Sequence, residues 1–177
     1  MDSDDEHPLE DRLRLALIPG VGPRLRQALL DAFGSPSAIL SASPAQLRQV
    51  PGIGRKLSEV IAQAQQTVPV AETLELCQAR QVTLLCDTDR HYPRLLRELP
   101  DPPGVLFLRG DLSARDAMAV AIVGTRHATQ YGLRQAERLA GNLARAGYTV
   151  VSGLARGIDA AAHRGALEAG GRTLAIL

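Results

Sequence analysis

The chain has 177 residues, 20 of them basic and 19 acidic, which gives a formal net charge of +1. Two cysteines, Cys77 and Cys86, are too few for a zinc site and wrongly spaced for a redox pair, and no apolar run reaches the length of a membrane span. We therefore expect a cytoplasmic protein with no bound metal and no cofactor.

The acidic residues are concentrated at the amino terminus. Residues 1–10 carry five acids and no base, which leaves 20 basic and 14 acidic residues, a net charge of +6, on the rest of the chain. We predict that residues 1–7 form a disordered acidic tail, because this stretch is short and lacks an apolar period.

Residues 8–68 are predicted to form a small all-helical domain. Apolar residues recur there at helical spacing, and Ser35 and Ser43 each precede a proline and are predicted to cap two short helices. Strand-like runs begin only later, which places a linker at TVPV, residues 67–70.

The helical region contains an internal repeat. IPGVGPRL at 18–25 and VPGIGRKL at 50–57 share the pattern apolar-Pro-Gly-apolar-Gly-x-x-Leu. Open amides at such a tight turn suit a phosphate oxygen, and the two turns resemble a tandem helix-hairpin-helix domain that binds DNA backbone. A bundle used only for protein contacts fits the pattern equally well. The candidate backbone contacts are Gly20, Gly22, Arg24, Gly52, Gly54, Arg55 and Lys56, with Arg26 following the first turn.

Residues 71–177 are predicted to form a Rossmann-like domain. Two strands are predicted in VTLLC and DPPGVLFLRG, and AMAVAIVG at 117–124 reads as a parallel strand buried on both faces. An amphipathic helix, the strand YTVVSG, a second helix and the strand RTLAIL follow. This β-α-β-α-β order is typical of a doubly wound parallel sheet with right-handed crossovers. The chain stops inside the last strand, so we expect a truncated domain from a longer protein.

The segment VGTRHATQYG follows the first of these strands and is neither a dinucleotide fingerprint nor a P-loop. Gly124 allows a turn, Thr125 offers a hydroxyl and an amide, and Arg126 brings a permanent charge. Thr129 is placed to cap the next helix. These groups suit a single phosphate, although an ordinary strand-to-helix turn with a solvated arginine has the same composition.

The segment VSGLARGID follows the next strand and so lies at the same edge of the sheet. Gly157 is predicted to let the backbone approach a ligand, and Arg156 to face the same phosphate-binding concavity as Arg126. Asp159 and His163 are four residues apart on one helix face and are the only candidates for an acid-base pair. No nucleophile with an activating base accompanies them, so no catalytic residue is predicted.

Three segments together resemble the DNA-processing protein A family (DprA, also called Smf): DTDRHYPRLLRELPDPPGVLFLRGDL, AIVGTRHATQYG and VSGLARGIDAAAHRGALEAGGRTLAIL. The resemblance covers about residues 75–177, and a preceding SAM-like or helix-hairpin-helix domain also fits the family. It implies a Rossmann-like domain that binds and protects single-stranded DNA and helps to load the recombinase RecA in natural transformation. It implies no established enzymatic activity.

The resemblance also implies which loops contact DNA, since relatives bind the backbone through the two segments discussed above. With Arg156 and His163 added from the turn and helix themselves, the predicted DNA-binding residues are Gly124, Thr125, Arg126, Ser152, Gly153, Leu154, Ala155, Arg156, Gly157, Ile158, Asp159 and His163. Family members continue beyond this chain, and a homodimer of the full-length protein is a further expectation, as is duplex contact through the helical domain.

Two other functions remain open at this point. One is a phosphoribohydrolase-like enzyme that binds a nucleotide phosphate, although the Pro-Gly-Gly-x-Gly-Thr-x-x-Glu motif of such enzymes is missing. The other is an adaptor whose helical domain binds proteins while the sheet domain is structural.

Overall fold

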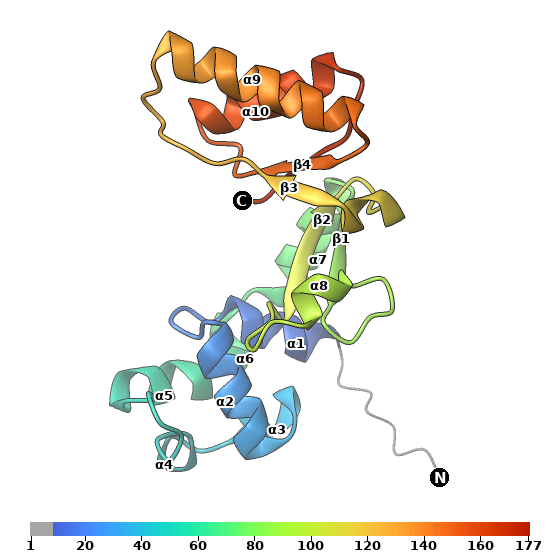
Figure 1. Cartoon of the computed structure of the whole chain (residues 1–177). Helices are drawn as coiled ribbons and strands as arrows, with labels where there is room; N and C mark the ends of the chain where they lie inside the picture. The colour runs from blue at the N-terminus through green and yellow to red at the C-terminus, as the bar shows by residue number, and fades with distance from the viewer. Residues whose placement is uncertain (1–8) are drawn as a thin grey trace. The chain divides into compact units, whose positions relative to one another are not determined.

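The computed structural model describes residues 9–177, so the predicted acidic tail at 1–7 lies outside the described residues. The chain divides into two compact units, Met1–Asp111 and Leu112–Leu177. Helices precede a parallel sheet along the chain, which confirms the mixed α/β class with a helical amino-terminal region (Figure 1). Within the described residues, no helix is long and apolar enough to cross a bilayer.

The first unit begins with a helical bundle. Ser35 accepts a hydrogen bond from the Ala38 amide at 3.1 Å, and Ser43 forms a reciprocal capping box with Gln46, so both predicted caps are confirmed. Leu29, at the centre of the bundle core, is fully buried. The helices are α1 (Leu9–Leu17), α2 (Pro23–Phe33), α3 (Pro36–Ser41), α4 (Pro44–Leu47), α5 (Arg55–Ala62), α6 (Ala64–Thr67) and α7 (Val70–Ala79).

Two antiparallel strands complete the first unit. β1 (Val82–Cys86) pairs with β2 (Val105–Arg109), and the short helix α8 (Arg94–Arg97) lies in the connection between them. This pair packs on α1 and α7 through a second core that contains Leu13 and Val70. The strands therefore form a sheet separate from the parallel one, and they belong to the first unit, which ends at Asp111. The domain boundary near residues 68–71 stays a prediction.

The second unit is a three-stranded parallel sheet with its two crossover helices. The strand order is β3-β4-β5, as the β-α-β-α-β pattern predicts. Short helix η1 precedes the sheet. The elements are η1 (Ala114–Ala117), β3 (Ala119–Ala121), α9 (Gln130–Arg145), β4 (Thr149–Ser152), α10 (Ile158–Glu168) and β5 (Thr173–Ala175).

Both helices lie on the same side of this sheet (Figure 1). Right-handed crossovers that advance in one direction across a sheet place their helices on one face, and the order β3-β4-β5 requires this. Val150 is fully buried beneath the helices, whereas Ala119 and Ala121 are exposed. The prediction that 117–124 is a strand buried on both faces is therefore wrong, because only one face is covered and β3 itself is three residues long.

Two glycines let α9 and α10 approach closely. A Cβ on Gly165 would lie 2.2 Å from the backbone oxygen of Glu137, and one on Gly141 would lie 3.1 Å from the backbone oxygen of Gly165. The two helix backbones are therefore in near contact over the sheet. Their packing fixes the direction in which each helix starts, and hence the position of the loop before it.

Candidate nucleic-acid interface

The first loop (residues 123–129) follows β3, and the second loop (residues 153–157) follows β4. Because β3 and β4 are parallel neighbours, both loops leave the same edge of the sheet. The backbone N–H of Ile158, at the start of α10, donates a hydrogen bond of 3.2 Å to the carbonyl oxygen of Thr125. The structure thus brings the two predicted loops together, in direct contact.

Gly157 makes this contact between the loops feasible. Its φ is +87°, and a Cβ there would lie 2.2 Å from the Thr125 oxygen and 2.9 Å from the Arg126 carbonyl carbon. A Cβ on Gly124 would likewise lie 2.7 Å from the Ile158 side chain. We expected Gly157 to let the backbone approach a ligand; in the structure it lets the second loop approach the first.

Asp159 joins the two loops from beneath. Its side chain is buried, and its two carboxylate oxygens accept hydrogen bonds from the backbone amides of Gly124, at 3.2 Å, and Gly153, at 3.1 Å. Hydrogen bonds to a charged acceptor are the stronger kind. Asp159 is therefore a positioning residue that fixes the relative placement of the loops, and its carboxylate is already engaged by protein donors.

Two further predicted residues are buried, Ser152 at the end of β4 and His163 in α10, opposite the beginning of β5. The hydroxyl of Ser152 donates a 2.6 Å hydrogen bond to the Ile122 carbonyl oxygen, which ties the ends of β3 and β4 together. The His163 Nδ1 lies 2.7 Å from the Thr173 hydroxyl oxygen, and that hydroxyl donates to the Val150 oxygen. A hydroxyl has one proton to donate, so Nδ1 carries the proton in the His163 bond. Ser152 and His163 thus contact protein groups.

Four predicted side chains are exposed at the surface of the loops, including that of Thr125. Arg126 and Arg156 are exposed, and neither guanidinium has a hydrogen-bond or ion-pair partner among residues 9–177. Leu154 is 55% exposed and has a φ of +55°, in the left-handed region that residues other than glycine rarely adopt. The loops therefore present two unpaired cations and two exposed apolar side chains, Val123 and Leu154, on a backbone that Asp159 holds by hydrogen bonds.

The threonines of the first loop organise its backbone. The Thr125 hydroxyl accepts a hydrogen bond from the His127 amide at 3.2 Å. The Thr129 hydroxyl accepts one from the Gly132 amide at 3.1 Å, which confirms Thr129 as the cap of α9. Arg126 is therefore the middle residue of a turn closed by Thr125 and is followed by a second turn at Thr129.

The two hairpins of the first unit have nearly identical backbones. Gly20 and Gly52 have φ of +89° and +90°, and Gly22 and Gly54 precede α2 and α5 with φ of −80° and −83°. No side chain caps either helix, and a Cβ added at Gly22 or Gly54 would have no neighbour within 4 Å. The amides at both helix starts are thus open.

Each hairpin also packs on the other. A Cβ on Gly20 would lie 3.4 Å from Leu57 Cδ1, and one on Gly52 would lie 2.9 Å from Leu25 Cδ2. The leucine that ends each repeat therefore covers the first glycine of the other repeat. This reciprocal contact explains why the two sequence motifs share glycine and leucine at the same spacing.

The cations near the hairpins differ in availability. Arg24 and Arg55 are largely exposed, although they lie 3.5 Å from Asp101 and 3.0 Å from Glu59. Lys56 is exposed and has no ion-pair partner within residues 9–177. Arg26 follows the first turn in the sequence, as a surface contact would, but its side chain is buried.

The buried guanidinium of Arg26 binds the carboxylate of Asp87, which also pairs with Arg12 at 3.3 Å. It packs so tightly that a Cβ on Gly104 would overlap it. Arg26 therefore connects α2 to the β1–β2 connection and is not a surface cation. Sequence reasoning missed this role, since no local signal distinguishes Arg26 from Arg24.

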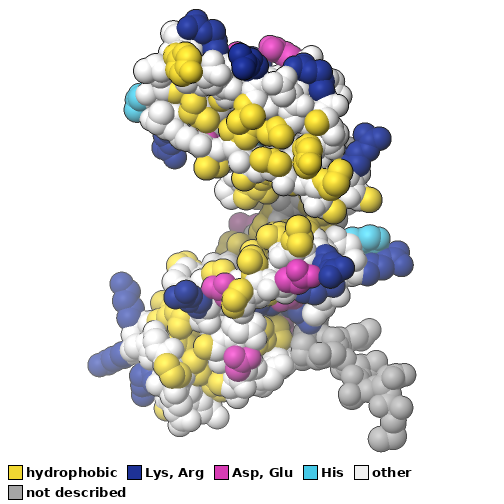
Figure 2. Space-filling model, in the orientation of Figure 1, with side chains coloured by type: hydrophobic (Ala, Val, Ile, Leu, Met, Phe, Trp, Pro, Cys, Tyr) yellow, Lys and Arg dark blue, Asp and Glu magenta, His cyan; other side chains and the backbone are white. Residues whose placement is uncertain are grey.

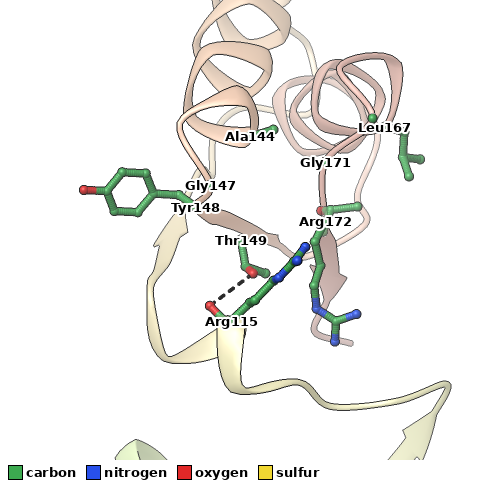
Figure 3. Close-up of a pocket in the computed structure, with 10 residues that line it drawn as sticks. Arg115, Ala144, Gly147, Tyr148, Thr149, Leu167, Gly171 and Arg172 are labelled. Carbon is green, nitrogen blue, oxygen red and sulfur yellow. Dashed lines mark hydrogen bonds between the residues drawn. The ribbon is translucent and has the colours of Figure 1, made fainter.

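A pocket of about 500 Å³ lies at the other ends of the strands, where β4 and β5 begin (Figure 3). Arg115 and Arg172 line it, and the Arg172 guanidinium binds both carboxylate oxygens of Asp116, at 2.5 and 2.8 Å. These hydrogen bonds lower the pKa of Asp116, against the opposing effect of burial. Asp116 also accepts a 3.1 Å hydrogen bond from Thr149, so the cluster anchors η1 to β4.

Two family models match separate stretches of the chain. The family model for DNA recombination-mediator protein A matches residues 83–177, and the model for a SAM-like helix-hairpin-helix tandem matches residues 13–64. The first match includes both loops, and the second includes both hairpins.

Several named proteins are similar to this chain. "Protein Smf" of Synechocystis is 39% identical over 164 residues, which is 90% of this chain and 41% of the relative. "DNA processing protein DprA" of Bacillus subtilis is 38% identical over 91 residues, 51% of this chain and 31% of the relative. The X-ray structure of DNA processing protein A from Streptococcus pneumoniae has a TM-score of 0.70 and 25% identity, covering 96% of this chain and 57% of that chain. The chain thus spans about half or less of each relative's length.

Proposed function

This chain belongs to the DNA recombination-mediator protein A family, and from that premise we propose that its second unit binds single-stranded DNA through the two loops. The observation that carries the proposal is the pair Arg126 and Arg156, exposed and unpaired on loops that Asp159 holds together. A guanidinium binds a phosphate oxygen pair in a planar, bidentate way, which suits a DNA backbone.

The spacing of the loops suits adjacent phosphates of one DNA strand. Neighbouring strands of a sheet lie about 4.8 Å apart, so two cations that follow neighbouring strands can reach successive phosphates of one backbone. The exposed Leu154 offers an apolar surface to unpaired bases. Backbone contacts of this kind read little sequence and weaken with salt.

We further propose that the bound strand is protected and passed to the recombinase RecA, as a mediator of recombination in natural transformation. The family name and the names of the relatives support this step. The relatives are longer than this chain, and the proposal assigns to the full-length protein the contacts with RecA and with a second copy of itself. Such a mediator would work in the cytoplasm, where the incoming strand meets RecA. The proposal includes no catalytic role for Asp159, since both of its carboxylate oxygens accept hydrogen bonds from backbone amides.

The helical unit is proposed as a second contact to DNA backbone, on single strands or duplex. The open amides before α2 and α5 support this, as do the exposed Arg55 and Lys56 beside the second hairpin. The first hairpin would contribute less, because Pro23 has no amide hydrogen. A domain used only for protein contacts would leave DNA affinity unchanged when Arg55 and Lys56 are replaced.

The proposed function is tested by fluorescence anisotropy with a labelled oligo-dT and a matched duplex at several salt concentrations. We expect Arg126→Ala and Arg156→Ala each to weaken single-strand binding and to reduce the salt slope by about 0.7 per lost contact. Arg90→Ala, another exposed arginine without a partner among residues 9–177, is the control and should bind as the wild type does.

The outcome separates the proposals. Binding that survives both loop substitutions but is lost with Arg55→Ala/Lys56→Ala would assign DNA to the hairpins and overturn the loop site. DNA binding that none of these changes affects would favour the adaptor. Turnover of nucleoside monophosphates by the chain would favour an enzyme instead.

A further inference from the structure

The outer face of α9 is a basic surface of the second unit. Leu112–Leu177 contains eight arginines and four acidic residues, a net charge of +4. Three of the arginines lie on α9, at 134, 138 and 145, and all three are exposed. In Figure 2, Arg side chains are spaced along the border of the second unit that α9 forms in Figure 1.

This charge is not neutralised by the helix itself. Glu137 is the only acidic residue of α9, and it is half-buried and bound to Arg164 of α10 at 2.7 Å. Arg134 and Arg138 have no ion-pair or hydrogen-bond partner among the described residues, and Arg145 bonds to the neutral Asn142. The outer face therefore presents hydrogen-bond donors to solvent without a compensating carboxylate.

The spacing along the helix suits a phosphate chain. With a rise of 1.5 Å per residue, Arg134 and Arg138 are about 6 Å apart along the axis, and Arg145 is about 16 Å from Arg134. Asn142, with an amide that can also donate, stands between Arg138 and Arg145. A stretched single strand places its neighbouring phosphates at a comparable separation, so one strand can meet successive donors along α9.

The face begins beside the proposed loop site. Thr129, the last residue of the first loop, caps α9, and Tyr131 in the first helical turn is 67% exposed. An exposed aromatic ring is a platform on which an unpaired base can stack. A DNA strand held at Arg126 can therefore reach Tyr131 next, and then Arg134 and the other arginines of α9.

We propose that the outer face of α9, from Tyr131 through Arg134 and Arg138 to Arg145, is a track for the single strand that leaves the two loops. The inference rests on the proposed function, because it supposes that the loops hold a strand. It adds that this unit engages more nucleotides than the loops alone can reach, and that the additional contacts are made to the backbone.

The test compares two lengths of oligo-dT, about 6 and about 18 nucleotides, within the range of site sizes of single-strand binding folds. Arg134→Glu/Arg138→Glu should weaken binding of the long strand roughly tenfold and lower its salt slope by about 1.4, while the short strand binds as before. Arg126→Ala should weaken both. Arg90→Glu/Arg109→Glu, an equal charge change at two exposed arginines of the first unit, is the control.

A second readout locates the strand directly. Ultraviolet crosslinking of a long strand carrying 5-bromouracil should label Tyr131 in the wild type and lose that label in Arg134→Glu/Arg138→Glu. Both measurements use the whole 177-residue chain, and a thermal melt of each variant confirms that it folds.

Each alternative outcome is decisive. Equal loss of short and long strands in Arg134→Glu/Arg138→Glu, or no loss of either, would overturn the track. A loss for the long strand in a chain indifferent to Arg126→Ala would refute the loop site, and with it a track that starts there, and would leave α9 as a separate DNA-binding surface. Wild-type chain that binds neither strand would refute both proposals. If Arg134→Glu/Arg138→Glu abolishes binding of a poly-glutamate peptide but leaves the affinity for both DNA strands unchanged, the track is refuted and the face is assigned to an acidic protein partner.

Discussion

Replacement of Asp159 by asparagine is expected to loosen both loops of the second unit. The two carboxylate oxygens accept hydrogen bonds from the Gly124 and Gly153 amides, and the side chain is buried. An asparagine offers one oxygen and one NH2 group, so one of the two amides would face another donor. A charge-assisted bond would be lost and a buried donor left unpaired, which together cost about 2–4 kcal/mol.

Hydrogen exchange is the sharpest assay of this change, because it reports on the two amides individually. A loss of about 2–4 kcal/mol should accelerate exchange at Gly124 and Gly153 roughly 30- to 800-fold if those amides exchange by local opening. Amides in the α2–α5 bundle should be unaffected. Glu168→Gln makes the same chemical change at an exposed carboxylate and should leave both rates as they are.

The same variant tests whether Asp159 positions the loops or contacts the ligand. If Asp159 only positions the loops, the DNA affinity of Asp159→Asn should fall together with the faster exchange of the Gly124 and Gly153 amides. If Gly124 and Gly153 exchange as in the wild type while DNA affinity drops, Asp159 touches the ligand itself and the reasoning from its two hydrogen bonds is wrong.

Two further predictions concern stability of the second unit. Arg172 holds the folded-state pKa of Asp116 below its unfolded value of about 3.9, so this pair stabilises the fold above that pH and the contribution is lost as the pH falls through the folded-state pKa. In urea titrations between pH 2 and 6, the stability advantage of the wild type over Asp116→Asn should therefore shrink towards the acid end; an advantage that stays constant with pH would contradict this. Gly165→Ala should destabilise the unit by about 1–3 kcal/mol, because its Cβ would overlap the backbone oxygen of Glu137. Gly132→Ala, whose Cβ meets nothing closer than 3.5 Å, should be tolerated, and equal thermal melts for the two alanine variants would disprove the packing argument.

Local signals in the sequence predicted the local features of the fold. Ser35, Ser43 and Thr129 are caps in the structure because capping depends on residues within one helical turn. The two Pro-Gly-x-Gly turns were recognisable because each requires glycine at a defined backbone conformation. Alternating strands and helices likewise indicated the β3-α9-β4-α10-β5 order.

Features that depend on contacts distant in the sequence were not predictable in the same way. Arg24 and Arg26 read alike, yet only Arg26 meets Asp87, which is 61 residues away. Asp159 was considered as half of an acid-base pair or as a DNA contact, because one of its two acceptor bonds reaches back to Gly124, 35 residues earlier. Gly157 was correctly identified as a backbone requirement, but the group that it accommodates is the neighbouring loop.

The distribution of ion pairs explains how a chain with a net charge of only +1 can present a basic surface. In the second unit, Asp116 is bound by Arg172, Glu137 by Arg164, and Asp159 by two backbone amides. Three of its four acids are therefore engaged by internal partners, so they do little to screen the remaining arginines from an approaching phosphate.

The free cations of this unit are then those of the two loops and of α9, together with Arg115 at the opposite ends of the strands. Loosening an internal pair should change this surface as well as the stability. Glu137→Gln would release Arg164, and its added unpaired charge beside α9 should raise affinity for the long strand if the track exists. An unchanged affinity, measured at low salt where such charges act over the longest range, would show that the strand does not pass this face of the unit.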